Sequence, residues 1–140
     1  MKYWFLLAAI VVIAFVMIGA HNVREKRSQQ KREAAYQTAL RSYSEVLKPG
    51  MTRKEVEDYL RARNASFRQM CCVNRKDFSK RAYDDLTMIG REDAPWVCSE
   101  KNIYIAFQFS GTETRSGAPT AEASDKLTAV TVYPWLEGCL

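Results

Sequence analysis

The chain has 140 residues, and its apolar start leaves about 120 for folded structure, which is enough for one small domain. A multidomain enzyme is therefore excluded. The formal charge of +5 conceals an uneven distribution, because residues 1–81 hold 17 Lys/Arg against 7 Asp/Glu, whereas residues 82–140 hold 4 against 9. The two parts therefore carry formal charges of +10 and −5, and the basic part is suited to an anionic surface.

The first predicted element is an apolar helix. Residues Tyr3 to Ala20 contain no charge, and as a helix they would extend about 27 Å, close to the thickness of the hydrocarbon layer of a bilayer. Tyr3 and Trp4 lie at one edge, where aromatic rings favour the headgroup level, and the polar sequence starts at His21. We therefore predict a transmembrane anchor at residues 1–21 of a single-pass membrane protein.

Two other N-terminal signals are alternatives to a permanent anchor. A cleaved secretory signal needs small residues before the cut, which Gly19 and Ala20 supply, although Ile18 is bulky and the apolar run is long. A lipoprotein signal needs a cysteine at the position where His21 stands, so lipidation there is excluded.

Five cations follow the apolar run and bear on both partner and compartment. They could contact anionic lipid headgroups, each contributing about 1 kcal/mol near the surface, or they could form a solvated helix face. No recognised motif supports nucleic acid as a partner. The positive-inside rule favours a cytoplasmic C-terminal domain, whereas the even number of cysteines favours the exported side, which we expect. The five cations are Arg24, Lys26, Arg27, Lys31 and Arg32.

The sequence from residue 22 to residue 47 predicts a helix, because it lacks Gly and Pro and its second half carries apolar residues at steps of three and four. We divide the chain into the anchor, a basic juxtamembrane helical stalk at residues 22–43, and a small domain at residues 44–140. Pro49-Gly50 ends the first helix. Thr52 and Glu55 have the spacing of a capping box, which predicts a second helix that ends near Arg63-Asn64.

Strand patterns follow the second helix. Residues 103–109 alternate between apolar and other side chains, which predicts a strand with one face on the core. Residues 127–133 predict a second strand that Pro134 ends, and residues 67–73 a third, while the pattern for a fourth at 85–89 is weaker. The predicted fold class is α+β: a transmembrane helix continuing into a juxtamembrane helix, then a helix and a small antiparallel sheet, in an αα-βββ-like order.

A helix-start motif carries a resemblance to a known family. Residues 47–60 contain Gly50-Met51-Thr52, with Glu55-Val56 and then Leu60 at fixed spacing, and this segment resembles the corresponding helix of BamE-like (SmpA/OmlA) small envelope domains. The resemblance implies two helices before a three-stranded sheet, and a non-enzymatic scaffold or protein-binding role with another envelope protein as partner. This chain differs from the family because it would be carried on a transmembrane anchor instead of a lipid.

The four cysteines, Cys71, Cys72, Cys98 and Cys139, are disulfide candidates that the family pattern does not explain. A redox site usually places two cysteines two residues apart, whereas the close pair here is adjacent, and a zinc site needs paired ligands in two clusters. Structural disulfides are the preferred interpretation, with free thiols and a thiol-dependent redox or metal-binding protein as alternatives. A bridge from Cys139 to any other cysteine would enclose at least about 40 residues.

No catalytic residue, metal ligand, cofactor or small-molecule substrate is evident from the sequence. The single histidine lies far from the folded domain, and the acidic pairs Asp84-Asp85 and Glu92-Asp93 are interpreted as solvated turn residues. Pro95-Trp96 lies in a predicted loop. Packing of the indole against the sheet is the simpler interpretation of this loop, and a partner-binding tip is the alternative.

Overall fold

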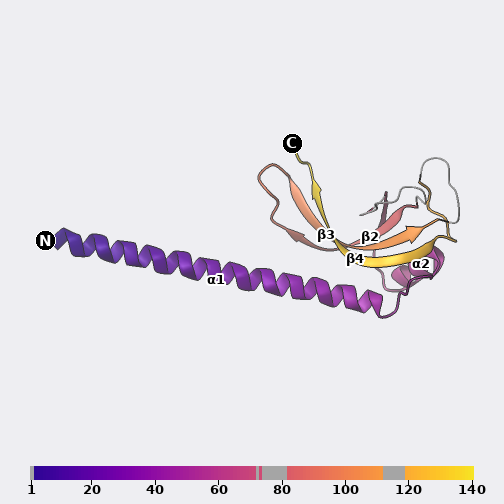
Figure 1. Cartoon of the computed structure of the whole chain (residues 1–140), viewed down its shortest axis with the longest axis horizontal. Coiled ribbons are helices and arrows are strands. Elements are labelled where there is room, and N and C mark those ends of the chain that lie inside the picture. The colour runs from indigo at the N-terminus through magenta and orange to yellow at the C-terminus, as the bar shows by residue number, and fades with distance from the viewer. Residues whose placement is uncertain (1, 72, 74–81, 112–118) are drawn as a thin grey trace. The chain divides into compact units, whose positions relative to one another are not determined.

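The structure is a computed structural model that describes residues 2–71, 73, 82–111 and 119–140, with the backbone alone for residues 2–14. The chain divides into two compact units, Met1–Ala35 and Tyr36–Leu140. Two helices and four strands are described in these residues (Figure 1): α1 Lys2–Ser44, α2 Arg53–Ala62, β1 Arg68–Met70, β2 Asp84–Glu92, β3 Glu100–Ser110 and β4 Lys126–Glu137.

The structure overturns the prediction of a transmembrane anchor. Within the part of the chain that it describes, no helix is both long and apolar enough to cross a membrane. The described side chains of α1 begin at Phe15, and the polar sequence already starts at His21. A membrane-spanning helix needs about 20 mainly apolar residues, which this part of α1 does not supply. The transmembrane helix in the predicted fold class, and the predicted single-pass membrane localisation, are therefore wrong.

Helix α2 begins as the sequence predicted. The side chain of Thr52 accepts a hydrogen bond from the Glu55 backbone N–H at 3.3 Å, and the Glu55 carboxylate accepts one from the Thr52 backbone N–H at 2.6 Å. This capping box satisfies two backbone donors that the first turn of a helix leaves without partners. The helix then buries Val56 and Leu60 on one face.

The four strands form one antiparallel sheet in the order β1-β2-β3-β4, so the α+β class is confirmed. Strand β2, which had the weakest sequence pattern, is nine residues long and pairs with both β1 and β3. Strand β1 is only three residues long. Strand β4 continues through Pro134 because it is an edge strand, where a residue without an N–H is tolerated. The basic segment at residues 74–81 lies outside the described residues.

The core of the domain lies between one face of the sheet and the helices. Ile105, Phe107 and Phe109 are all fully buried and cluster with Val56 and Leu60 of α2, as the alternation in β3 predicted. The prediction that only one face of β3 meets a core is wrong, because Tyr104 and Ala106 on the other face are buried as well. The C-terminal end of α1 and α2 lie on the same side of the sheet (Figure 1). Leu86, Tyr104 and Ala106 face the opposite side, where they form a second, smaller cluster.

Tyr36 of α1 packs directly on β2 at Gly90. A Cβ atom added at Gly90 would lie 2.8 Å from Tyr36 Cε1 and 2.9 Å from its hydroxyl oxygen. We therefore expect Gly90→Ala to lower the free energy of unfolding by about 1–3 kcal/mol, because the buried ring has to move. Urea unfolding followed by circular dichroism measures this loss.

Gly19→Ala is the matched control for Gly90→Ala, since no atom lies within 4 Å of the Cβ that it adds. The control should leave the unfolding of the domain unchanged. A second substitution, Tyr36→Leu, should recover part of the loss caused by Gly90→Ala. If Gly90→Ala were as stable as the control, Tyr36 would not pack on β2 in solution.

The structure also corrects the interpretation of the first acidic pair. Asp84 and Asp85 are fully buried at the start of β2 and are not solvated turn residues. The Asp84 carboxylate accepts hydrogen bonds from the backbone N–H groups of Val73 at 2.7 Å and Phe109 at 2.9 Å. Because each N–H keeps a partner inside the protein, Asp84 joins segments that lie far apart in the sequence.

Arg53, in the first turn of α2, is the counter-charge of Asp85. It is only 2% exposed, and its guanidinium lies 2.5 Å from an Asp85 oxygen and 3.4 Å from an oxygen of the buried Asp125. The guanidinium also donates to the Tyr83 carbonyl and stacks 4.0 Å from the centre of the Phe109 ring. A buried charge of this kind requires such partners, because its desolvation is costly.

A candidate protein-binding tip

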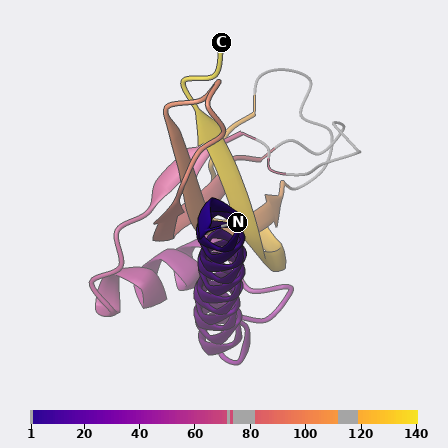
Figure 2. The same cartoon turned by 90° about the vertical axis from the view of Figure 1, so that its left-hand side faces the viewer.

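The end of the sheet away from α2 is formed by two chain segments that lie side by side. The connection between β2 and β3, residues 93–99, meets residues 138–140 at the C-terminal end (Figures 1 and 2). We call these two segments the tip. The Ser99 N–H donates to the Glu137 carbonyl at 3.0 Å, and the Leu140 N–H donates to the Val97 carbonyl at 2.9 Å. Backbone hydrogen bonds therefore hold the two segments in register.

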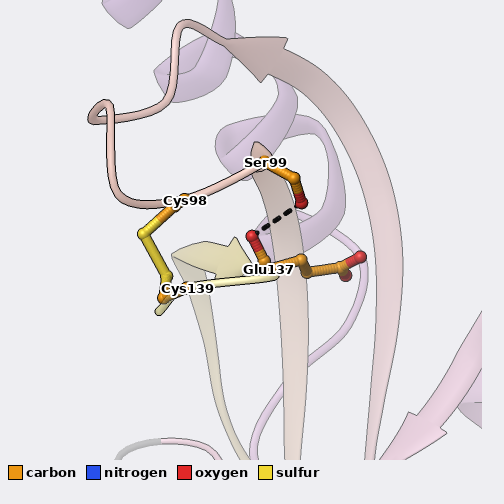
Figure 3. Close-up of a disulfide and its surroundings, with 4 residues drawn as sticks. All are labelled: Cys98, Ser99, Glu137 and Cys139. Carbon is orange, nitrogen blue, oxygen red and sulfur yellow. Dashed lines mark hydrogen bonds between the residues drawn. A yellow bond between two sulfur atoms is a disulfide. The ribbon is translucent and has the colours of Figure 1, made fainter.

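A disulfide between Cys98 and Cys139 joins the same two segments (Figure 3). Beside it, the Ser99 hydroxyl donates a second hydrogen bond to the Glu137 carbonyl at 2.9 Å. Gly138, which lies between Glu137 and Cys139 in the chain, has a φ of 61°, a value that favours glycine. A Cβ atom at Gly138 would collide with the Ser99 side chain. The disulfide and the hydrogen bonds therefore hold the two segments of the tip together.

Trp96 projects from the tip into solvent. Its side chain is 93% exposed, so the indole does not pack against the sheet as the simpler interpretation of the sequence proposed. The loop that carries it is closed by a turn in which the Cys98 N–H donates to the Pro95 carbonyl at 2.8 Å. A large aromatic side chain is thus displayed on an ordered loop, and Pro95 beside it is also exposed.

The charged residues at the base of the tip are largely paired with one another. Lys101 lies 2.8 Å from Glu92, and Arg91 lies 3.5 Å from Glu100. These pairs connect the ends of β2 and β3 across the sheet, whereas Asp93 is exposed on the tip itself. The exposed surface around Trp96 is therefore apolar with an acidic neighbour.

The other two disulfide candidates, Cys71 and Cys72, do not belong to the two segments of the tip. Cys71 is exposed and is also disulfide-bonded, while Cys72 lies outside the described residues. No cysteine that the structure describes is a free thiol. Within the same residues, no group of three or more His, Cys, Asp or Glu side chains is arranged to hold a metal ion. A thiol-dependent or metal-binding role stays a prediction.

The five cations with predicted headgroup contacts all lie on α1 within the unit Met1–Ala35. Their side chains are exposed, apart from that of Arg32, which is partly buried and donates a hydrogen bond to the Ser28 hydroxyl at 3.0 Å. Contact of these cations with lipid headgroups stays a prediction.

Comparison with known proteins found no matching family model, no matching curated protein and no matching solved structure. The BamE-like resemblance of residues 47–60 therefore stays a prediction. The geometry of the tip has to be interpreted from its own residues.

Proposed function

We propose that the domain at residues 36–140 is a non-enzymatic protein-binding module, and that Trp96 anchors it in an apolar pocket of a partner protein. One observation carries the proposal: a tryptophan that is 93% exposed stands on a loop that is held by a disulfide and by backbone hydrogen bonds. An exposed tryptophan on an ordered loop is a common feature of binding surfaces, because tryptophan is enriched among the residues that dominate binding energy.

The energetic basis is the burial of the indole. A tryptophan side chain buries about 150–250 Å² of surface, which at about 25 cal/mol per Å² corresponds to roughly 4–6 kcal/mol before the costs of association. An ordered loop reduces those costs, since little conformational freedom is lost when the partner binds. The disulfide between Cys98 and Cys139 supplies this order.

The charge at the tip favours a protein over an anionic lipid surface. Asp93 is exposed next to the apolar residues, and a carboxylate is repelled by anionic headgroups. A protein pocket with a basic rim would accept both the indole and this carboxylate. The implied scaffold role of BamE-like domains agrees with this proposal.

The first experiment identifies the partner. A photo-crosslinking amino acid at position 96 should give a discrete crosslinked species in cells that produce the protein, and mass spectrometry identifies it. The same amino acid at position 46 is the control, because Val46 is 47% exposed and lies between α1 and α2, outside the tip. A species that forms equally from both positions would argue against the tip as the binding site.

The second experiment measures the energy that Trp96 contributes. With the purified partner, Trp96→Ala should weaken binding by at least about 2 kcal/mol, or roughly thirtyfold in Kd, as expected for a dominant anchor residue. Trp96→Phe should lose less, and Val46→Ala should bind like the wild type. Isothermal titration calorimetry measures all three variants. Unchanged affinity in Trp96→Ala would refute the proposal.

A further inference from the structure

A pocket lies on the face of the sheet opposite the helices, and the lining residues that the structure describes do not include Trp96. Its volume is about 300 Å³, and its lining residues are Ser66, Phe67, Arg68, Leu86, Met88 and Tyr104. Leu86 and Tyr104 are buried and form an apolar surface, while Met88 beside them is 45% exposed. Cross-strand pairing of Arg68 with Leu86 and of Met88 with Tyr104 fixes these side chains on one face.

Among the described residues that line the pocket, Arg68 is the one that carries a charge. Its guanidinium lies 4.7 Å from the centre of the Tyr104 ring, so its planar group is positioned over an aromatic face. One of its nitrogens lies 2.8 Å from a carboxylate oxygen of Glu137 at the end of β4. Arg68 therefore already holds a carboxylate at the margin of an apolar pocket.

The pair between Arg68 and Glu137 is replaceable. The two side chains are 47% and 33% exposed, and ion pairs at such positions contribute little to stability because water screens them. The hydrogen bond from the guanidinium lowers the pKa of Glu137. A second carboxylate could take the place of Glu137 without disturbing the core.

We propose that this pocket binds a small-molecule monocarboxylate with a short apolar body. The carboxylate pairs with Arg68 in place of Glu137, and the apolar body lies against Leu86, Met88 and Tyr104. Planar guanidinium groups match the geometry of carboxylates, and a single cation suits a single negative charge. A volume of about 300 Å³ is at the lower end of the range for small-molecule sites. This proposal does not depend on the role of Trp96.

The test is a titration of the full chain, labelled with nitrogen-15, with 3-phenylpropionate as the probe. Amide signals of residues 66–68, 86–88 and 104 should shift in a saturable way, whereas the signal of Trp96 should not. The neutral analogue 3-phenylpropanol should bind at least about tenfold more weakly, because it cannot form the charged pair with Arg68. Equal binding of the alcohol would overturn the proposal.

Two substitutions change binding in opposite directions. Arg68→Gln should weaken binding of 3-phenylpropionate by at least about tenfold, since it removes the cation. Glu137→Gln should strengthen binding severalfold, because it removes the competing carboxylate while keeping the backbone carbonyl that Ser99 contacts. Arg63→Gln is the matched control, because Arg63 is exposed and stacks on Tyr59 instead. A loss of affinity in Glu137→Gln would contradict the competition.

A peptide that ends in a phenylalanine carboxylate presents the same chemistry from a protein source. If the peptide shifted the pocket signals and 3-phenylpropionate did not, the assignment of a small molecule would be wrong. If neither compound shifted these signals in a chain that remains folded, the pocket would have no affinity for apolar carboxylates. Only binding of the free acid that depends on Arg68 supports the proposal.

Discussion

Replacement of Cys98 and Cys139 together by serine should lower the free energy of unfolding of the domain by roughly 4 kcal/mol. The two cysteines are 41 residues apart, and cross-linking a loop of that length removes this much conformational entropy from the unfolded chain. The enclosed segment contains both β3 and β4, which are the two longest strands. The bridge therefore restricts the conformations that the β3–β4 segment can adopt in the unfolded chain.

The serine variant isolates this bridge better than a chemical reductant, because Cys71 is disulfide-bonded as well and a reductant would act on both. Denaturant unfolding compares the variant with the wild type. Amide hydrogen exchange should also accelerate at Ser99 and Leu140, whose N–H groups bond across the tip. Equal stability and unchanged exchange would contradict a structural role for the bridge.

The sequence predicted those features that depend on neighbouring residues. The capping box of Thr52 and Glu55 is a contact between residues three apart, and the structure confirms it. The alternation in β3 is also a local pattern, and it predicted the face that carries Ile105, Phe107 and Phe109, but not the burial of Tyr104 and Ala106 on the other face. These local features were sufficient for the α+β class and for antiparallel pairing of β3 with β4.

The sequence could not predict features that depend on distant partners. Four cysteines allow three pairings, and no local pattern selects Cys98 with Cys139. The exposure of Trp96 depends on how the bridge and the C-terminal segment hold its loop, so composition alone favoured packing. Strand β2 was obscured because it begins with two buried acids, and acidic residues are usually exposed.

The sequence also could not predict that Arg53 is the counter-charge of Asp85. Arg53 and Asp85 are 32 residues apart, and Arg53 and Asp125 are 72 apart. Arg53 sits in the first turn of a helix with exposed charged neighbours, so the pattern gave no sign that it is buried. An arginine at the margin of an apolar helix face is nevertheless the signal from which such a partner could be suspected.

Burial makes the stability of the domain depend on the ionisation of Asp85. Desolvation raises the pKa of Asp85 from 3.8 to about 7, and Arg53 opposes this rise without cancelling it. Its second carboxylate oxygen is buried without a hydrogen-bond partner among the described residues. The folded protein therefore holds the proton of Asp85 more tightly than the unfolded chain does.

The sign of the pH dependence follows from this difference. At pH values well below 3.8 both states are protonated at Asp85, so the contribution of the raised pKa is fully present. As the pH rises from about 4 to about 7, the unfolded chain releases the proton first, and the free energy of unfolding falls. A shift of roughly three pKa units corresponds to a loss of about 4 kcal/mol, and no further loss from this group is expected above pH 7.

The substitution Asp85→Asn should remove this loss, because asparagine keeps an acceptor for Arg53 and does not titrate. The measurement is the free energy of unfolding in urea from pH 4 to pH 8, taken as the difference between the variant and the wild type. Exposed carboxylates with lowered pKa values, such as Asp58, give the opposite slope, but they are common to both proteins and cancel. Asp58→Asn is the control, and it should retain the loss of stability that Asp85 causes. If the difference between wild type and Asp85→Asn grew in favour of the wild type with rising pH, Arg53 would stabilise the Asp85 carboxylate more than burial destabilises it.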